Sequence, residues 1–236
     1  MMATASPSHA AASTATDRAA ALAAAVADIA AQYERDSNVA ALHRRIADAI
    51  DAAAREWPAE PAPSEVVAAA VGRPAPRTFA DALVAAARPH EQVPEIAGPL
   101  YERVVALRPD DARALVVLAN AYWLHGRGPD VVGELAARAL AADPASRGAW
   151  HLWALTDADP RQRMLRWQQV TVRFPGDDLA RALFADAAAS VAGAEHDDEA
   201  LVLAVAAYKD LLSRAERPEQ RAALETAITT LTNWKL

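Results

Sequence analysis

Apolar residues recur along most of this chain at spacings of three and four, which is the period of an amphipathic helix. The first stripe comprises Leu22, Val26, Ile29 and Tyr33. The second, after a polar break at residues 36–38, comprises Val39, Leu42, Ile46, Ala49, Ala53 and Trp57. We expect the first helix to begin at a Thr16 or Asp17 cap. Because the turn between the two helices is so short, the pattern predicts an antiparallel hairpin over residues 16–57.

The sequence on either side of this hairpin disfavours regular helix. Residues 1–15 are small and polar and include a proline, and we expect them to form a disordered tail. Residues 58–77 are rich in proline and predict a linker, with one short helix over residues 65–71. A two-helix hairpin buries too little apolar surface to be stable alone. It must therefore pack on the rest of the chain or on a second copy of itself.

The segment from Leu100 to Pro144 has the pattern of a helical repeat. Residues 104–111 (VVALRPDD) and 139–146 (ALAADPAS) both run from an apolar helical turn through a proline into small or acidic residues. The two prolines are 35 residues apart, and a period in the mid-thirties is typical of arrays of helical hairpins. Such arrays bind other molecules, so the pattern indicates a binding role without naming the ligand.

This segment resembles the tetratricopeptide repeat, a helix-turn-helix unit with large, small, aromatic and proline residues at fixed positions. The clearest copy matches at Leu115, Leu118, Ala119, Tyr122, Gly126, Ala139 and Pro144, with one residue inserted near Arg127 and Gly128. A second copy matches at Trp150, Trp153, Ala154, Trp167, Val170 and Pro175, and a weaker third at Phe184, Ala185, Ala188, Tyr208 and Leu211. The resemblance implies an all-α solenoid over residues 78–236, closed by a C-terminal capping helix that starts at Pro218.

In tetratricopeptide folds the first helix of each hairpin lines a concave groove that holds a peptide, and the resemblance assigns that role to nine positions here. They are Arg113, Val116, Asn120, Trp123, Leu124, His151, Leu155, Leu183 and Asp186. Such a groove would accept a helix or an extended peptide. Alternatively, Val116 and Trp123 pack on a neighbouring helix or on the N-terminal hairpin. Some members of the family hold a C-terminal carboxylate, but Val116 and His151 occupy the expected lysine positions, which argues against that site.

Composition narrows the class of protein further. Alanine provides 64 of the 236 residues, which favours closely packed helices, and no segment has the alternation of a strand. The net charge of −7 argues against a nucleic-acid partner. The chain has no cysteine, no run of about 20 apolar residues and no basic segment typical of a signal peptide. We therefore expect a cytoplasmic protein that does not span a membrane.

The sequence contains none of the common catalytic or cofactor motifs, and no two histidines stand at positions i and i+4. We therefore expect no catalytic, cofactor-binding or metal site. The one cluster with ligand-like chemistry runs from Glu195 to Glu199, and we expect its acidic residues to cap the helix that follows. Asp110–Asp111 and Asp177–Asp178, each after a proline, have the same interpretation.

Trp150, Trp153 and Trp167 form the richest aromatic group in the chain. Trp150 and Trp153 are three residues apart and so share a helix face. Such a group is either a binding hot spot or a set of large core residues between alanine-rich helices. Because Trp150 and Trp153 occupy the large positions of the repeat, we favour the core.

These observations predict a non-enzymatic scaffold that binds an unidentified protein or peptide in the groove of a helical array. The main alternative is a structural role, in which the hairpin of residues 16–57 makes the chain a homodimer. An enzyme is the third candidate, and the lack of a nucleophile, metal or phosphate motif argues against it.

Overall fold

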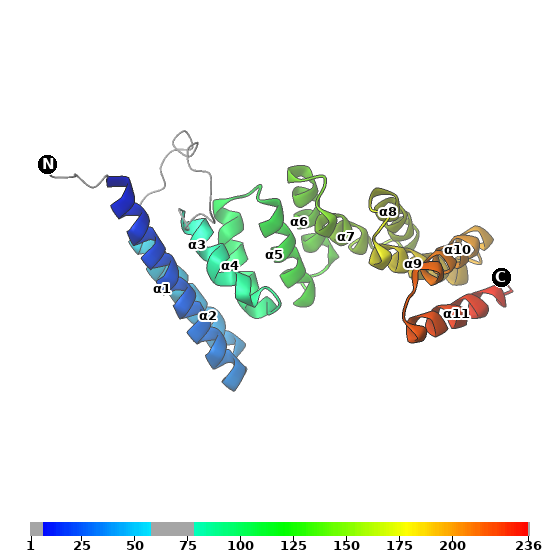
Figure 1. Cartoon of the computed structure of the whole chain (residues 1–236), viewed down its shortest axis with the longest axis horizontal. Helices are drawn as coiled ribbons and strands as arrows, with labels where there is room; N and C mark the ends of the chain where they lie inside the picture. Colours follow the sequence, from blue (N-terminus) through cyan, green and yellow to red (C-terminus); the bar gives the residue numbers. More distant parts are fainter. Residues whose placement is uncertain (1–6, 58–77, 236) are drawn as a thin grey trace. The chain divides into compact units, whose positions relative to one another are not determined.

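The computed structural model describes residues 7–57 and 78–235, and the surroundings of side chains from Ala15 onward (Figure 1). Within these ranges every regular element is a helix, which confirms the all-α prediction. The described residues form two compact units, one ending at Arg127 and the other beginning at Gly128. The predicted linker of residues 58–77 and its short helix lie outside the described residues.

No helix in the described part of the chain is both long and apolar enough to cross a membrane.

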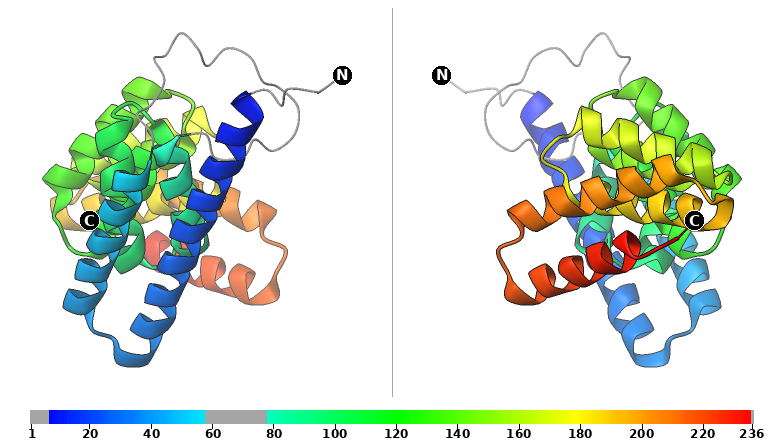
Figure 2. Two further views of the ribbon diagram at one scale, coloured as in Figure 1. Left: turned by 90° about the vertical axis from the view of Figure 1, so that its left-hand side faces the viewer. Right: turned by 90° about the vertical axis from the view of Figure 1, so that its right-hand side faces the viewer.

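Unit 1 contains α1 (Pro7–Asp36), α2 (Val39–Glu56), α3 (Phe79–Ala87), the short 3-10 helix η2 (Arg88–His90), α4 (Pro94–Leu107) and α5 (Ala112–Leu124). Helices α1 and α2 run antiparallel and side by side (Figure 2, left). Helix α1 also packs on α3, α2 packs on α4, and α4 packs on α3 and α5. The N-terminal hairpin therefore finds its apolar partner in the helices that follow it.

The core of unit 1 draws buried side chains from all of its α-helices. Its largest fully buried side chains are Val26, Ile46, Leu83, Ile96, Leu100, Tyr101, Val104 and Leu115. Helix α2 buries Leu42, Ile46 and Ile50, whereas Val39 is 40% exposed. The buried face of α2 thus runs through Ile50, whereas Ala49 and Ala53 are half-buried, because the larger side chain gains more from burial.

Helix α1 begins at Pro7, nine residues before the predicted Thr16 cap. Part of the stretch that we expected to be disordered is therefore helical. Proline is compatible with the first turn of a helix, where its missing N–H would have no intrahelical partner. Half of the eight residues between Pro7 and Thr16 are alanine and none is glycine or proline, so nothing in the sequence stops the helix from extending back to Pro7.

Unit 2 contains α6 (Pro129–Ala142), α7 (Arg147–Leu155), α8 (Pro160–Arg173), α9 (Asp178–Glu195), α10 (Asp198–Arg214) and α11 (Pro218–Thr232). Each helix packs on the next one in the chain. In Figure 2, right, α10 and α11 lie antiparallel and side by side. The side chains of Ser146, Asp159, Asp177 and Asp197 each accept a hydrogen bond from the first turn of the helix that follows.

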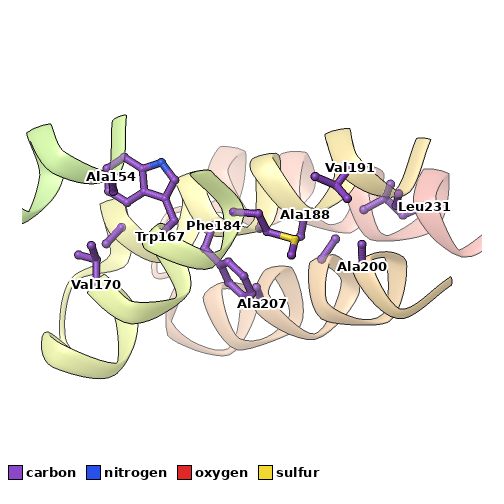
Figure 3. Packing of buried hydrophobic residues seen from close by; sticks show 14 residues of the cluster. Ala154, Trp167, Val170, Phe184, Ala188, Val191, Ala200, Ala207 and Leu231 are labelled. Carbon is purple, nitrogen blue, oxygen red and sulfur yellow. The ribbon is translucent and has the colours of Figure 1, made fainter. Parts of the chain in front are cut away.

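A continuous apolar cluster joins α7 to α11 in unit 2 (Figure 3). Its large members are Met164, Trp167, Val170, Phe184, Val191 and Leu231, and the others are alanines. The alanines let the helix backbones approach closely, and the larger side chains fill the space that remains. Leu231 brings α11 into the cluster, in the place predicted for the capping helix, whereas Trp234 is 39% exposed.

Candidate binding surfaces

The nine residues predicted to line a groove divide between the two units. Five of them lie on α5 in unit 1, and four lie on α7 and α9 in unit 2. Each set is described within its own unit, because its surroundings there decide which side chains remain available to a ligand.

On α5, Arg113 is already engaged within the protein. Its Nη2 lies 2.9 and 3.0 Å from the two carboxylate oxygens of Glu91, which also accepts a hydrogen bond of 2.5 Å from the Tyr101 hydroxyl. The hydrogen bond and charge of Glu91 raise the pKa of Arg113. Burial, followed by the same carboxylate, raises the pKa of Tyr101. Arg113 thus ties the start of α5 to the segment after η2.

The remaining predicted residues of α5 are more exposed toward its C-terminal end. Val116 is half-buried, Asn120 is exposed, and Trp123 and Leu124 are 38% and 67% exposed. At spacings of three and four they follow one side of the helix. The amide of Asn120 and the large apolar side chains of Trp123 and Leu124 therefore lie at the surface of unit 1.

In unit 2, His151 is held by a neighbouring carboxylate. Its Nε2 lies 2.8 Å from Oδ2 of Asp177, and its ring meets that of Trp167 edge to face at 5.3 Å between centroids. Asp177 is buried, caps α9 through the Ala180 N–H, and also faces Arg147 at 3.7 Å. Burial alone would raise the pKa of Asp177, but the hydrogen bonds from Ala180 and His151 lower it.

The other three predicted residues of unit 2 also have partners in the fold. Leu155 and Leu183 are half-buried against the apolar cluster. Asp186 is exposed but accepts a hydrogen bond from the Tyr208 hydroxyl, and burial together with this carboxylate raises the pKa of Tyr208. The predicted residues of unit 2 therefore stabilise the packing of α7, α9 and α10.

A pocket of about 420 Å³ opens between α7 and α8, and sequence reasoning did not predict it. Its lining consists of Trp150, Gln168, Gln169, Val172 and Arg173. The side chain of Val172 is 76% exposed, although α8 buries Met164, Trp167 and Val170 on another face. The sequence signal that could have indicated this pocket is Val172 itself. It is an apolar residue outside the buried stripe of α8, and it shares a helix face with Gln168 four residues earlier.

Trp150 forms one wall of this pocket and is held rigidly. Its Nε1 donates a hydrogen bond of 2.9 Å to the Pro144 carbonyl, and its ring meets Trp153 edge to face at 5.3 Å. Arg166 lies over the Trp153 ring at 4.5 Å and pairs with Asp157 at 2.7 Å. The expectation that all three tryptophans are core residues is therefore correct for Trp167, which is 3% exposed, but Trp150 and Trp153 are half-buried.

The acidic cluster of residues 195–199 has the predicted capping role. Asp197 accepts a hydrogen bond of 2.9 Å from the Ala200 N–H at the start of α10. Arg161 of α8 pairs with Glu195 at 2.6 Å and with Asp197 at 2.5 Å. The Ala200 N–H and Arg161 lower the pKa of Asp197. Among the described residues, no group of three or more His, Asp or Glu side chains is placed to hold a metal ion.

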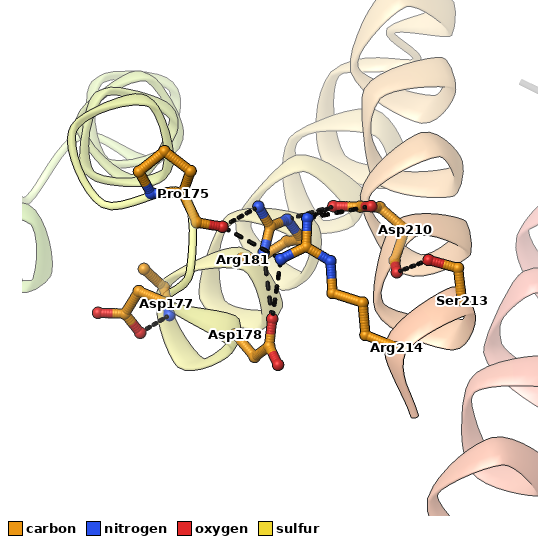
Figure 4. Close-up of polar contacts among 8 residues, drawn as sticks. Pro175, Asp177, Asp178, Arg181, Asp210, Ser213 and Arg214 are labelled. Carbon is orange, nitrogen blue, oxygen red and sulfur yellow. Dashed lines mark hydrogen bonds and ion pairs between the residues drawn. The ribbon is translucent and has the colours of Figure 1, made fainter. Parts of the chain in front are cut away.

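A network of charges fixes the turn between α8 and α9 (Figure 4). Arg181, 8% exposed, pairs with Asp210 at 2.6 Å and Asp178 at 3.2 Å, and donates a hydrogen bond of 2.8 Å to the Pro175 carbonyl. Arg214 of α10 reaches the same three acceptors at 3.1 to 3.5 Å. Because every acceptor already has a partner, this network has a structural role.

No protein-family model matches this chain, and no curated protein shows significant similarity to it.

Proposed function

We propose that this protein is a non-enzymatic interaction scaffold, built as a tetratricopeptide-like array of helical hairpins, which binds a peptide or helix of a partner protein. The regular positions of the helices support the repeat. Helices α4, α6 and α8 each end two residues before a proline, and α5, α7 and α9 each begin three residues after it. Asp111, Ser146 and Asp177 cap those three helices in the same way.

The observation that carries the proposal is the pocket lined by Trp150 and Val172. A tryptophan ring held by its neighbours gives a rigid apolar surface that loses little conformational entropy when a ligand binds. The amides of Gln168 and Gln169 can donate to and accept from a peptide backbone, and Arg173 can pair with an acidic side chain. An apolar wall with a few polar groups at its edge is what an anchor residue of a peptide requires.

A pocket of this size with few polar anchors favours moderate affinity. We expect a dissociation constant on the order of micromolar, or about 8 kcal/mol of binding free energy. On the tetratricopeptide resemblance, the exposed residues Asn120, Trp123 and Leu124 of α5 would offer a separate contact surface on unit 1.

The decisive experiment is selection from a random peptide library displayed on phage, with the full chain as target. Selected peptides are then measured by fluorescence polarisation against the wild type, Val172→Glu and Val202→Glu. Val172 on α8 is 76% exposed and Val202 on α10 is 67% exposed, so neither change should affect folding. Only Val172 lines the pocket. We expect the Val172 variant to lose at least tenfold in affinity and the Val202 variant to bind like the wild type.

Two results would contradict this proposal. If no peptide is enriched, the protein does not act by binding linear peptides. If both valine variants bind equally well, the peptide binds elsewhere, and Asn120→Ala with Trp123→Ala then tests the surface of α5.

The alternative of self-association through the N-terminal hairpin is less well supported. The apolar side chains that would form such an interface, among them Leu22, Val26 and Ile46, are at most 3% exposed within one copy of the chain. Light scattering of the full chain measures whether it is a monomer or a dimer. A stable dimer would have to form through a surface of the hairpin other than this buried apolar face. Removal of residues 1–77 should expose α3 and α4 and cause aggregation.

A further inference from the structure

Unit 1 contains a pocket of its own, which is separate from the Trp150 pocket of unit 2 and which the proposed function does not use. It has a volume of about 450 Å³ and lies where α2, α4 and the end of α5 meet. Its lining consists of His43, Ala47, Gly98, Pro99, Glu102, Tyr122, His125 and Arg127. Pockets that bind small molecules usually have volumes of about 300–1,000 Å³.

One side of this pocket is preorganised around Tyr122. Its hydroxyl donates a hydrogen bond of 2.8 Å to Glu102, and the guanidinium of Arg127 lies over its ring at 4.8 Å from the centroid. Burial, followed by the hydrogen bond to Glu102, raises the pKa of Tyr122 to about 12, so the hydroxyl remains a donor. The Arg127 backbone N–H also donates to the Tyr122 carbonyl, which fixes the chain after α5.

The other side of the pocket is apolar and small. Ala47 and Gly98 contribute little side-chain volume, and Pro99 presents its ring from within α4. This combination leaves space beside the Tyr122 ring. A flat or branched apolar group could occupy that space and contact the rings of Tyr122 and Pro99.

The charge of the lining indicates which polar group a ligand carries. The guanidinium of Arg127 lies over the Tyr122 ring, and its N–H groups match the geometry of a planar carboxylate. Glu102 already accepts the Tyr122 hydroxyl, and its negative charge would repel a dianion such as phosphate more than a single carboxylate.

We propose that this pocket binds a carboxylate carried on an apolar body, with Arg127 as its principal partner and Tyr122 and Pro99 as its apolar contacts. His43 and His125 line the same pocket, so their ring signals report its occupation. This site does not depend on the Trp150 pocket. Such a carboxylate belongs either to a free carboxylic acid or to an acidic side chain flanked by apolar residues in a peptide, and the experiment below distinguishes the two.

The test is an NMR titration of the full chain. The probes are phenylacetate and the peptide Ac-Ala-Phe-Glu-Phe-Ala-NH2. Their uncharged controls are phenylacetamide and the same peptide with glutamine in place of glutamate. We expect each charged probe to shift the imidazole Cε1–H signals of His43 and His125 saturably, while the signals of His90 and His151 stay unchanged. The dissociation constant from these shifts should be at least tenfold lower for each charged probe than for its uncharged control.

Three variants identify the site. Arg127→Gln should weaken binding at least tenfold, and Ala47→Met should weaken it about fivefold by filling the pocket without changing its charge. Arg103→Gln, an exposed arginine of α4 outside the pocket, should have no effect. Circular dichroism of each variant verifies the fold.

Each outcome decides the proposal. Tighter binding of phenylacetate than of the peptide assigns the site to a free acid, and the reverse assigns it to an acidic peptide. The proposal is wrong if neither charged probe gives saturable shifts, if each charged probe binds no better than its control, or if Arg127→Gln and Arg103→Gln behave alike. None of these results bears on peptide binding at Trp150.

Discussion

The charge network around Arg181 gives the sharpest prediction about stability (Figure 4). We consider Arg181→Met, which keeps most of the buried apolar stem and removes the guanidinium. The change abolishes contacts of 2.6 Å to Asp210, 3.2 Å to Asp178 and 2.8 Å to the Pro175 carbonyl. A hydrogen bond to a charged group contributes about 1.5–3 kcal/mol.

The net effect is smaller than the sum of these contacts for two reasons. The side chains of Asp178 and Asp210 are 54% and 42% exposed, so water can solvate them after Arg181 is removed. Arg214 also contacts the same three acceptors and can replace part of the lost charge. We therefore expect the free energy of unfolding to fall by about 2 kcal/mol, which is below the 3–5 kcal/mol typical of breaking a fully buried ion pair.

The assay is urea unfolding of the full chain, followed by tryptophan fluorescence and circular dichroism. Arg214→Met is the matched control, because its side chain is 40% exposed and surface pairs contribute about 0–1 kcal/mol. The double variant should lose more than the sum of the two single changes, since each arginine partly compensates for the other. The reasoning is refuted if Arg181→Met costs under about 0.5 kcal/mol or if Arg214→Met costs as much.

Three further predictions follow from burial and capping. Trp167→Ala should destabilise the protein by about 3–5 kcal/mol, as removal of large core side chains does, and Trp150→Ala should cost less because its ring is half-buried; thermal unfolding would contradict this if the order were reversed. Asp111→Ala removes the cap of α5 and should cost about 1 kcal/mol in urea unfolding, whereas Asp111→Asn should be nearly neutral. Asp177 has a lowered pKa, so its carboxylate stabilises the fold above the unfolded-state pKa of about 3.9, and this contribution is lost as the pH falls through the folded-state value. The stability difference between wild type and Asp177→Asn should therefore shrink as the pH falls below about 4; a difference that grows there would exclude this role.

The sequence by itself predicted the positions of most helices. Helix α2 begins at Val39, the first residue of the predicted second stripe, and α11 begins at the predicted Pro218. The reason is that prolines, capping aspartates and apolar stripes act over only a few residues. Asp111, Asp177 and Asp197 each cap the helix that begins at the next residue. The exception is α1, which begins at Pro7, whereas the predicted cap Thr16 lies inside the helix.

Only the tertiary structure decided which side chains remain available to a ligand. The sequence marks Arg113, His151 and Asp186 as candidate binding residues, but each has a partner distant in the chain: Glu91, Asp177 and Tyr208. The Trp150 pocket likewise requires α8 to lie against α7. Local signals define a helix because its hydrogen bonds join residues four apart, whereas exposure and charge pairing depend on which helices pack together, and that is set by the whole core.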